Sequence, residues 1–287
     1  MRTFVRTQEG TTAWTAPPPV ERILGRPVLP TMHGFFSLGT VVGATAGMVL
    51  TAVAYPAAWH LLVIGLISVP VAVLSVRHLP AGLGRGTAAG NRERGSAPVW
   101  RDPILLIIGV ITLAMALTEG AANDWLPLIM VDGHGFGAAL GSAVYVVFAA
   151  AMTLGRFTGN RFLERYGRAR VLAAGAIIGG AGVALVIVVD SRLVAFAAVL
   201  LWGLGAALGF PVAMSAAGES GDHPAARVSL VATVGYVAFL VGPPALGFLG
   251  DHYGLRNAMI VVLAFLVLAA AMAVRLHRAT ARVEVAG

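Results

Sequence analysis

Eight apolar segments, each about twenty residues long, follow one another along this 287-residue chain. About 20 residues of helix cross the ~30 Å hydrocarbon core of a bilayer. Because the backbone must satisfy its own hydrogen bonds in lipid, and because the segments are uniformly apolar rather than alternating, each is expected to be a helix and not a barrel strand. The expected spans, the third of which could extend to Met130, are Met32–Ala54, Ala57–Val76, Pro103–Asn123, Phe136–Arg156, Ala169–Val189, Leu193–Ala216, Val228–Leu249 and Asn257–Val274.

The composition agrees with an all-α polytopic membrane protein. Hydrophobic residues make up 58% of the chain and charged residues 11%, whereas soluble domains carry about 25% charged residues. The chain has no cysteine, which excludes disulfides and thiolate metal sites. No metal-ligand spacing, phosphate-binding loop, nucleophile motif or dinucleotide fingerprint is present, so we expect no metal, no cofactor and no enzymatic activity.

The arginines predict the orientation. All 20 cationic residues are arginine, and the formal net charge is +7. They lie between apolar spans, which points to membrane topology and lipid headgroups rather than to nucleic acid. With alternate loops assigned to opposite sides, and Arg156 counted at the edge of its span, 18 arginines fall on one side; only Arg192 and Arg256 fall on the other. The positive-inside rule makes the first side cytoplasmic, together with both termini.

The stretch "GRFTGNRFLERYGRARV", Gly155–Val171, is the densest group of arginines. A topology signal would explain it, but its internal order suggests a tight gating turn in which Gly167 adopts positive φ and arginines form ion pairs that break and re-form. It resembles the G-x-x-x-D-R-x-G-R-R signature loop of the major facilitator superfamily, although Glu164 replaces the aspartate and lies one residue later. The residues that carry the resemblance are Gly159, Glu164, Arg165, Gly167, Arg168 and Arg170.

Three further stretches resemble the same superfamily. Val241–Met259 is similar to the segment joining its last two helices, and we expect Gly242, Pro243 and Pro244 to kink that span. Val20–Gly47 resembles the entry to its fifth helix. There Gly39, Gly43 and Gly47 share one helix face and are expected to permit close packing. Leu117–Leu128 resembles the seventh helix of bacterial inner-membrane permeases.

The resemblance implies a domain organisation. Residues 1–31 would be a polar cytoplasmic segment, 32–76 two helices of an N-terminal half, 77–102 a cytoplasmic linker, 103–275 a complete six-helix C-terminal half and 276–287 a cytoplasmic tail. A full permease has twelve helices, so the eight spans would match the fifth to the twelfth of an N-terminally truncated chain. The alternative is a genuine eight-helix transporter.

The implied function is proton-coupled secondary transport of a small solute by alternating access in the bacterial inner membrane, inactive in the truncated chain. A non-transporting membrane remnant is the alternative. Residue type and depth in the span identify five candidates for the substrate or proton pathway: Glu119, Asn123, Tyr145, Trp202 and Tyr236. Glu119, ~24 Å along its helix and in the outer third of the membrane, would bind a proton or a hydroxyl, or else fix helix packing. Packing is also the alternative for the three aromatic residues.

The orientation can be tested with reporter fusions. Fusions at Gly90 and at the C-terminus should report a cytoplasmic location, and a fusion at Gly133 an external one, because the arginine-rich loops stay inside. Paired alkaline phosphatase and green fluorescent protein fusions would measure this. The reverse pattern would contradict the assignment.

Overall fold

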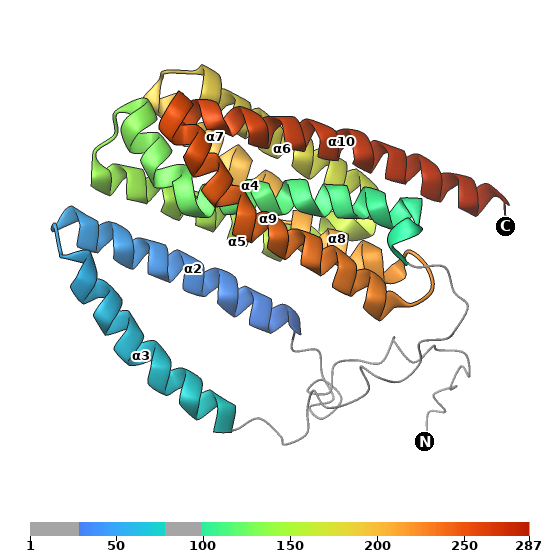
Figure 1. Cartoon of the computed structure of the whole chain (residues 1–287), viewed down its shortest axis with the longest axis horizontal. Helices are drawn as coiled ribbons and strands as arrows, with labels where there is room; N and C mark the ends of the chain where they lie inside the picture. Colours follow the sequence, from blue (N-terminus) through green and yellow to red (C-terminus); the bar gives the residue numbers. More distant parts are fainter. Residues whose placement is uncertain (1–28, 78–98, 287) are drawn as a thin grey trace.

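The computed structural model describes residues 29–77 and 99–286, and every regular element in these residues is a helix (Figure 1). Eight candidate membrane spans are present there, one of them shared by α7 and α8, which confirms the expected all-α architecture. The elements are α2 (Leu29–Ala52), α3 (Ala57–Arg77), the 3₁₀ turn η1 (Val99–Arg101), α4 (Pro103–His134), α5 (Ala138–Tyr166), α6 (Arg168–Val188), α7 (Arg192–Ala206), α8 (Gly209–Glu219), α9 (Pro224–Tyr253) and α10 (Leu255–Ala286).

Several helices are longer than the apolar segments that predicted them. The proposed tail 276–287 is helical in α10 as far as Ala286, and the proposed loop after Arg156 is helical in α5 as far as Tyr166. Hydropathy detects only the part of a helix that suits lipid. Arginine, leucine and glutamate are good helix formers, so the backbone hydrogen bonds continue beyond the apolar boundary. Residues 1–28 and most of the linker, 78–98, lie outside the described residues.

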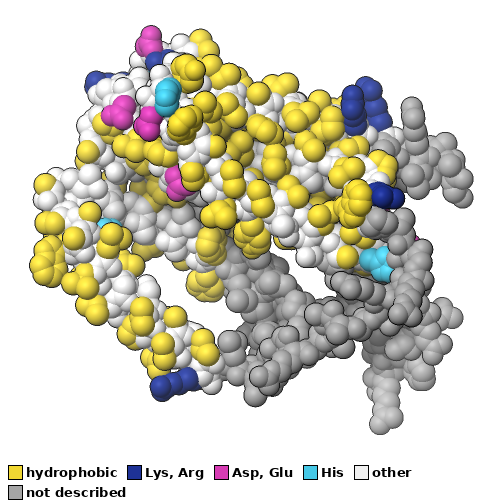
Figure 2. All heavy atoms as spheres, viewed as in Figure 1, with side chains coloured by type: hydrophobic (Ala, Val, Ile, Leu, Met, Phe, Trp, Pro, Cys, Tyr) yellow, Lys and Arg dark blue, Asp and Glu magenta, His cyan; other side chains and the backbone are white. Residues whose placement is uncertain are grey.

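Helix α4 is the centre of the bundle formed by α4–α10. Half of its residues are buried, and it packs against α5, α8, α9 and α10. The α2–α3 hairpin lies to one side: α2 packs on α5, and α3 has no buried residue (Figure 1). On the face that Figure 2 shows, hydrophobic side chains cover much of the helices, while charged side chains gather mainly towards the ends. This distribution is expected for helices whose sides contact lipid.

Glycine permits the closest helix contact, between α6 and α7. A Cβ added to Gly205 would lie 2.2 Å from the backbone nitrogen of Gly179, and one added to Gly182 would lie 2.5 Å from that of Trp202. Small residues are common where membrane helices approach closely, since van der Waals contact then drives association. The glycine stripe predicted on α2 is different: an added Cβ at Gly39, Gly43 or Gly47 would meet none of the described residues within 4 Å. Among the described residues no helix packs closely on these three glycines, and their role in close packing stays a prediction.

One end of the bundle is held by an aspartate with two roles. Asp102 caps α4, accepting a hydrogen bond from the backbone nitrogen of Ile104 at 2.8 Å, and Pro103 follows it at the first helical position. Its second carboxylate oxygen accepts from Arg227 at the start of α9. The Arg227 side chain is only 4% exposed and also donates to Ser220. The starts of α4 and α9 are thus joined to the segment after α8.

The opposite end contains the two arginines of the arginine-poor side. Arg192 donates to the carbonyl oxygen of His134 at 3.1 Å, and Arg256 donates to that of Ile187 at 2.7 Å. Both carbonyls lie near helix C-termini, where a cation interacts favourably with the helix dipole. Arg256 also pairs with Asp190, and this hydrogen bond and charge hold the pKa of the Asp190 carboxyl below its usual range. These arginines cap helices, which explains their presence on this side.

The α6–α7 contact predicts a difference between two glycine substitutions. Gly205→Ala should destabilise the protein by roughly 1–3 kcal/mol, because the new methyl group would meet backbone atoms that cannot move aside. Gly43→Ala, the matched control, should behave like the wild type because its Cβ faces open space. Thermal denaturation in detergent would measure both. Equal melting temperatures for the two variants would contradict the packing described here.

Candidate functional site

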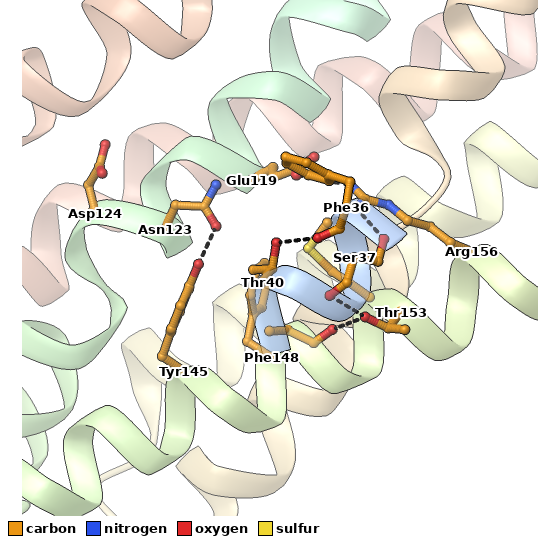
Figure 3. A pocket seen from close by; sticks show the side chains of 12 residues that line it. Phe36, Ser37, Thr40, Glu119, Asn123, Asp124, Tyr145, Phe148, Thr153 and Arg156 are labelled. Carbon is orange, nitrogen blue, oxygen red and sulfur yellow. Dashed lines mark hydrogen bonds and ion pairs between the residues drawn. The ribbon is translucent and has the colours of Figure 1, made fainter. Parts of the chain in front are cut away.

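A polar pocket of about 370 Å³ lies between α2, α4 and α5 (Figure 3). Its walls combine carboxylates, an arginine, hydroxyl groups and aromatic rings within segments that are otherwise apolar. Polar groups inside a membrane span are costly unless they have a partner or meet water, which marks this pocket as the candidate functional site. The lining residues are Phe36, Ser37, Thr40, Glu119, Asn123, Asp124, Tyr145, Phe148, Ala149, Met152, Thr153 and Arg156.

Arg156 connects the walls of the pocket. Its Nη2 donates to Glu119 Oε1 at 3.0 Å, and its Nη1 donates to Ser37 Oγ at 3.1 Å. Its Nε donates to the carbonyl oxygen of Ala207 at 3.3 Å. The guanidinium therefore joins α5 to α4, to α2 and to the break between α7 and α8. The geometry of a guanidinium, with donors in a rigid fork, suits such a junction.

The break between α7 and α8 follows from one proline. In a continuous helix the carbonyl of Ala207 would accept from the nitrogen of residue 211, but that residue is Pro211, which has no N–H. The helix is interrupted after Ala206 and resumes at Gly209. The carbonyl of Ala207 accepts from Arg156 instead. The expected single span Leu193–Ala216 is thus two helices, and the arginine satisfies a carbonyl that the proline leaves without a donor.

Glu119 lies at the middle of α4, whereas the shorter expected span placed it in the outer third of the membrane. Helix α4 continues to His134, so Glu119 lies sixteen residues after its first residue and fifteen before its last. It is therefore at the middle of the helix, ~24 Å from its start. The Glu119 side chain is 12% exposed and pairs with Arg156, which we had counted among the charges at the edge of its span. Arg156 lies ten residues before the end of α5 but three before the end of the candidate span Ala138–Gly159, which agrees with its expected place at the edge of the span.

Two predicted residues meet at the pocket wall. The hydroxyl of Tyr145 on α5 donates to Asn123 Oδ1 on α4 at 3.1 Å (Figure 3). The ring of Tyr145 stacks on Phe148, with centroids 6.1 Å apart. Of the five predicted pathway residues, Glu119, Asn123 and Tyr145 therefore come together in one pocket.

The other two predicted pathway residues lie elsewhere. Trp202 is fully buried behind the pocket, where its indole nitrogen donates to the carbonyl oxygen of Thr118 at 3.2 Å and its ring contacts the edge of Phe148. This arrangement matches the packing alternative for Trp202. Tyr236 lies on α9, is 66% exposed and does not line the pocket. Its ring is tilted against Phe210.

The arginine-rich stretch forms a turn of one residue. Gly167 ends α5 and precedes α6 with φ 76°, the positive value expected for it. Glu164 and Arg165 belong to the last turn of α5, while Arg168 and Arg170 begin α6. The predicted loop is thus shorter than expected. Its closest ion pair joins Arg168 to Glu219, at the end of α8, over 2.5 Å.

The remaining motif glycines and prolines have separate positions. A Cβ on Gly159 would lie 2.4 Å from the side chain of Leu208, so this glycine lets α5 approach the α7–α8 break. A Cβ on Gly242 would lie 2.4 Å from Leu117. Helix α9 is continuous through Pro243 and Pro244, and the carbonyl of Pro243 accepts from the indole nitrogen of Trp125 at 2.9 Å. The two prolines therefore do not interrupt α9, and the expected kink stays a prediction.

Several lining residues were not predicted from the sequence. Ser37, Thr40, Asp124 and Thr153 line the pocket but were not among the predicted pathway residues. The inward position of Arg156 could have been inferred from the sequence. Arg156 lies eleven residues before the turn at Gly167, which is ~16 Å along the helix that ends at this turn. Nothing in the sequence pairs it with Glu119. Among the described residues no group of three or more potential ligands could hold a metal ion.

The fold and pocket define a polytopic helical membrane protein with a partly charged cavity inside its spans. Comparison with known proteins identifies the family. The Major Facilitator Superfamily model matches residues 28–229 and 142–286, and the chain belongs to this family.

Two relatives and one solved structure describe this similarity further. An uncharacterized MFS-type transporter of Yersinia pestis is 31% identical over 256 residues, which cover 88% of this chain and 65% of that protein. An uncharacterized transporter of Sinorhizobium fredii is 29% identical over 259 residues, covering 88% and 67%. This chain thus spans about two thirds of the length of these relatives.

The structure of a bacterial homolog of the human lysosomal transporter Spinster, inward-facing and occupied, superimposes with a TM-score of 0.58 at 17% identity. The match covers 91% of this chain and 71% of that one, and it supports the fold.

The Arg156 junction predicts non-additive effects on stability. Arg156→Gln leaves Glu119 without its ion-pair partner and should cost on the order of 3 kcal/mol, whereas Glu119→Gln with Arg156→Gln should cost less than that single change. Thermal denaturation of the single and double variants in detergent would measure the coupling. Additive losses would show that the ion pair does not contribute to stability.

Proposed function

We propose that this protein is a secondary active transporter of a small solute and that the pocket of α2, α4 and α5 is its binding site. The supporting observation is the Glu119–Arg156 pair, placed in the pocket at the middle of α4. Transporter sites lie near the bilayer midplane, between parts of the fold that move relative to each other. The pocket has this character, because α2 supplies one wall and the α4–α10 bundle supplies the rest.

Alternating access would require α2 to move relative to α5. Among the contacts between these helices are two polar ones across the pocket: Ser37 Oγ accepts from Arg156, and the Ser37 carbonyl accepts from Thr153 at 3.5 Å. Few and partly exposed hydrogen bonds are easily exchanged for bonds to water or to a solute. We infer that solute binding and the α2–α5 contact compete for the same polar groups.

We further propose that transport is driven by protons and that Glu119 carries the proton. Its carboxylate would pair with Arg156 when ionised and release that arginine when protonated, so that proton binding changes the contacts of the pocket. The sequence contains no phosphate-binding loop, which favours a gradient over ATP as the energy source.

The turn at Gly167 is proposed to gate the cytoplasmic side. The Arg168–Glu219 pair joins this turn to the end of α8, and its side chains are 43% and 53% exposed. An exposed ion pair contributes only about 0–1 kcal/mol. Such a contact can break in each transport cycle at small cost. In this orientation the protein lies in the bacterial inner membrane with both termini in the cytoplasm, as the arginine distribution predicts.

The alternative is a non-transporting membrane protein, and the position of α3 shows what transport would need. Helix α3 has no buried residue, so the described helices leave the far side of α2 without a protein wall. Proton-driven transport by this chain alone would then require a wall from a second copy. The uptake experiment below separates the two possibilities.

Uptake into proteoliposomes under an imposed proton gradient should show that Glu119→Gln abolishes accumulation, because glutamine cannot bind the proton. Asp132→Asn is the matched control: it removes a carboxylate from the same helix, outside the pocket, and should leave uptake near the wild-type rate. A panel of radiolabelled sugars, amino acids and amines would be screened first with the wild type.

The same assay tests the gate. Arg168→Ala should slow uptake without changing its half-saturating concentration, since the pair lies outside the pocket. If the folded wild type accumulates none of the solutes, the non-transporting alternative stands. Unchanged accumulation by Glu119→Gln would remove the proton-carrying role from that residue.

A further inference from the structure

The charges of the pocket do not balance, and this imbalance bears on the class of solute. Glu119 and Asp124 supply two carboxylates, and Arg156 supplies the one guanidinium among the lining residues. Because Glu119 pairs with Arg156, the remaining charge belongs to Asp124. No hydrogen bond or ion pair joins Asp124 to any other residue in the described part of the chain.

Arg156 is largely engaged by protein groups. Each of its three guanidinium nitrogens donates one hydrogen bond, to Glu119, Ser37 or the carbonyl of Ala207, which leaves two of the five N–H donors of a guanidinium. An anionic solute at these two donors would share a pocket with the carboxylates of Glu119 and Asp124, and like charges repel.

Asp124 lies within the membrane span. It is ten residues before the end of α4 at His134, or ~15 Å along the helix axis, and one helical turn and a half beyond Glu119. Asp124 is exposed and makes no hydrogen bond to another side chain among the described residues, so its carboxylate is left to water or to a bound partner. A bound cation would supply the partner.

Aromatic rings complete the chemistry. Phe36 on α2 and the stacked pair Tyr145 and Phe148 on α5 line the same pocket as Asp124 (Figure 3). The faces of aromatic rings attract ammonium groups, and pockets that combine such rings with a carboxylate recognise organic cations. The side-chain amide of Asn123 is held in place by Tyr145 and offers a further polar contact beside Asp124.

We propose that the pocket binds a small organic cation, an ammonium carried on an apolar or aromatic group, with Asp124 as its counter-ion and the rings of Phe36 and Tyr145 as its walls. This inference rests on the proposed function of the pocket as a solute site. It assigns Asp124 a role in selecting charge that is separate from the role of Glu119.

Three probes of the same shape and different charge test this assignment: benzylammonium, benzyl alcohol and benzoate. The full chain would be purified into lipid nanodiscs, and binding would be measured by isothermal titration at neutral pH. Benzylammonium should bind most tightly and benzoate most weakly. Asp124→Asn should weaken benzylammonium binding at least tenfold and leave benzyl alcohol unaffected, while Asp124→Glu should retain the preference for the cation.

Asp132→Asn is again the control, because Asp132 lies on α4 outside the pocket; it should not change any of the three affinities. Thermal denaturation of each variant shows that it is folded. Three outcomes would each overturn the cation assignment: benzoate binds most tightly, no probe binds, or benzylammonium binds equally well to the wild type and to Asp124→Asn. If benzyl alcohol or benzoate binds and this binding is lost in Tyr145→Ala, the pocket is still a solute site although the cation assignment is wrong. If benzylammonium binds but is not taken up, only the proposal of transport is overturned.

Discussion

A charged guanidinium inside a candidate membrane span must be surrounded by acceptors, and the arrangement around Arg156 meets this requirement. Its three partners come from α4, α2 and the α7–α8 break, so a single side chain fixes the relative positions of several helices. One acceptor is the carbonyl of Ala207, which Pro211 leaves without a backbone donor, and the carboxylate of Glu119 supplies the opposite charge. The pocket exists where these polar groups meet, since apolar packing cannot fill the space around them.

The two ends of the bundle use arginine in different ways. On the arginine-rich side, Arg168 and Arg227 pair with carboxylates from other helices. On the opposite side, Arg192 and Arg256 donate chiefly to backbone carbonyls at helix ends. The first kind of contact can exchange partners, while the second completes the hydrogen bonding of a helix terminus. This difference is consistent with a gate at the arginine-rich end and a fixed cap at the other.

The family assignment and the length of the chain both bear on the proposed function. Major facilitator relatives match nearly nine tenths of this chain, yet the chain spans only about two thirds of them. The α4–α10 bundle has its own buried core around α4, whereas α2 and α3 add little to that core. The pocket lies at the boundary between these parts. One wall of the pocket therefore comes from α2, which is among the least buried of the described helices.

The amino-acid sequence by itself determined the fold class, the eight spans and the positive φ at Gly167. Helix length, hydropathy and the conformational freedom of glycine are local properties, which a sequence displays directly. Glu119, Asn123 and Tyr145 were also recognisable, because a polar side chain is conspicuous inside an apolar segment. The ends of the helices were less predictable: hydropathy falls where lipid ends, and the hydrogen bonding of α5 and α10 continues.

Only the tertiary structure decided which of these residues share a site. Arg156 and Glu119 are 37 positions apart and Arg156 and Ser37 are 119 apart, and no spacing rule connects such pairs. By residue type and expected depth, Trp202 and Tyr236 were both candidates for binding residues. The rotation of each helix about its own axis turns Trp202 into the core and Tyr236 outward. The face that a membrane helix presents to its neighbours depends on packing between segments, whereas the tendency to span depends on each segment alone. The sequence therefore determined the spans, and packing determined the pocket.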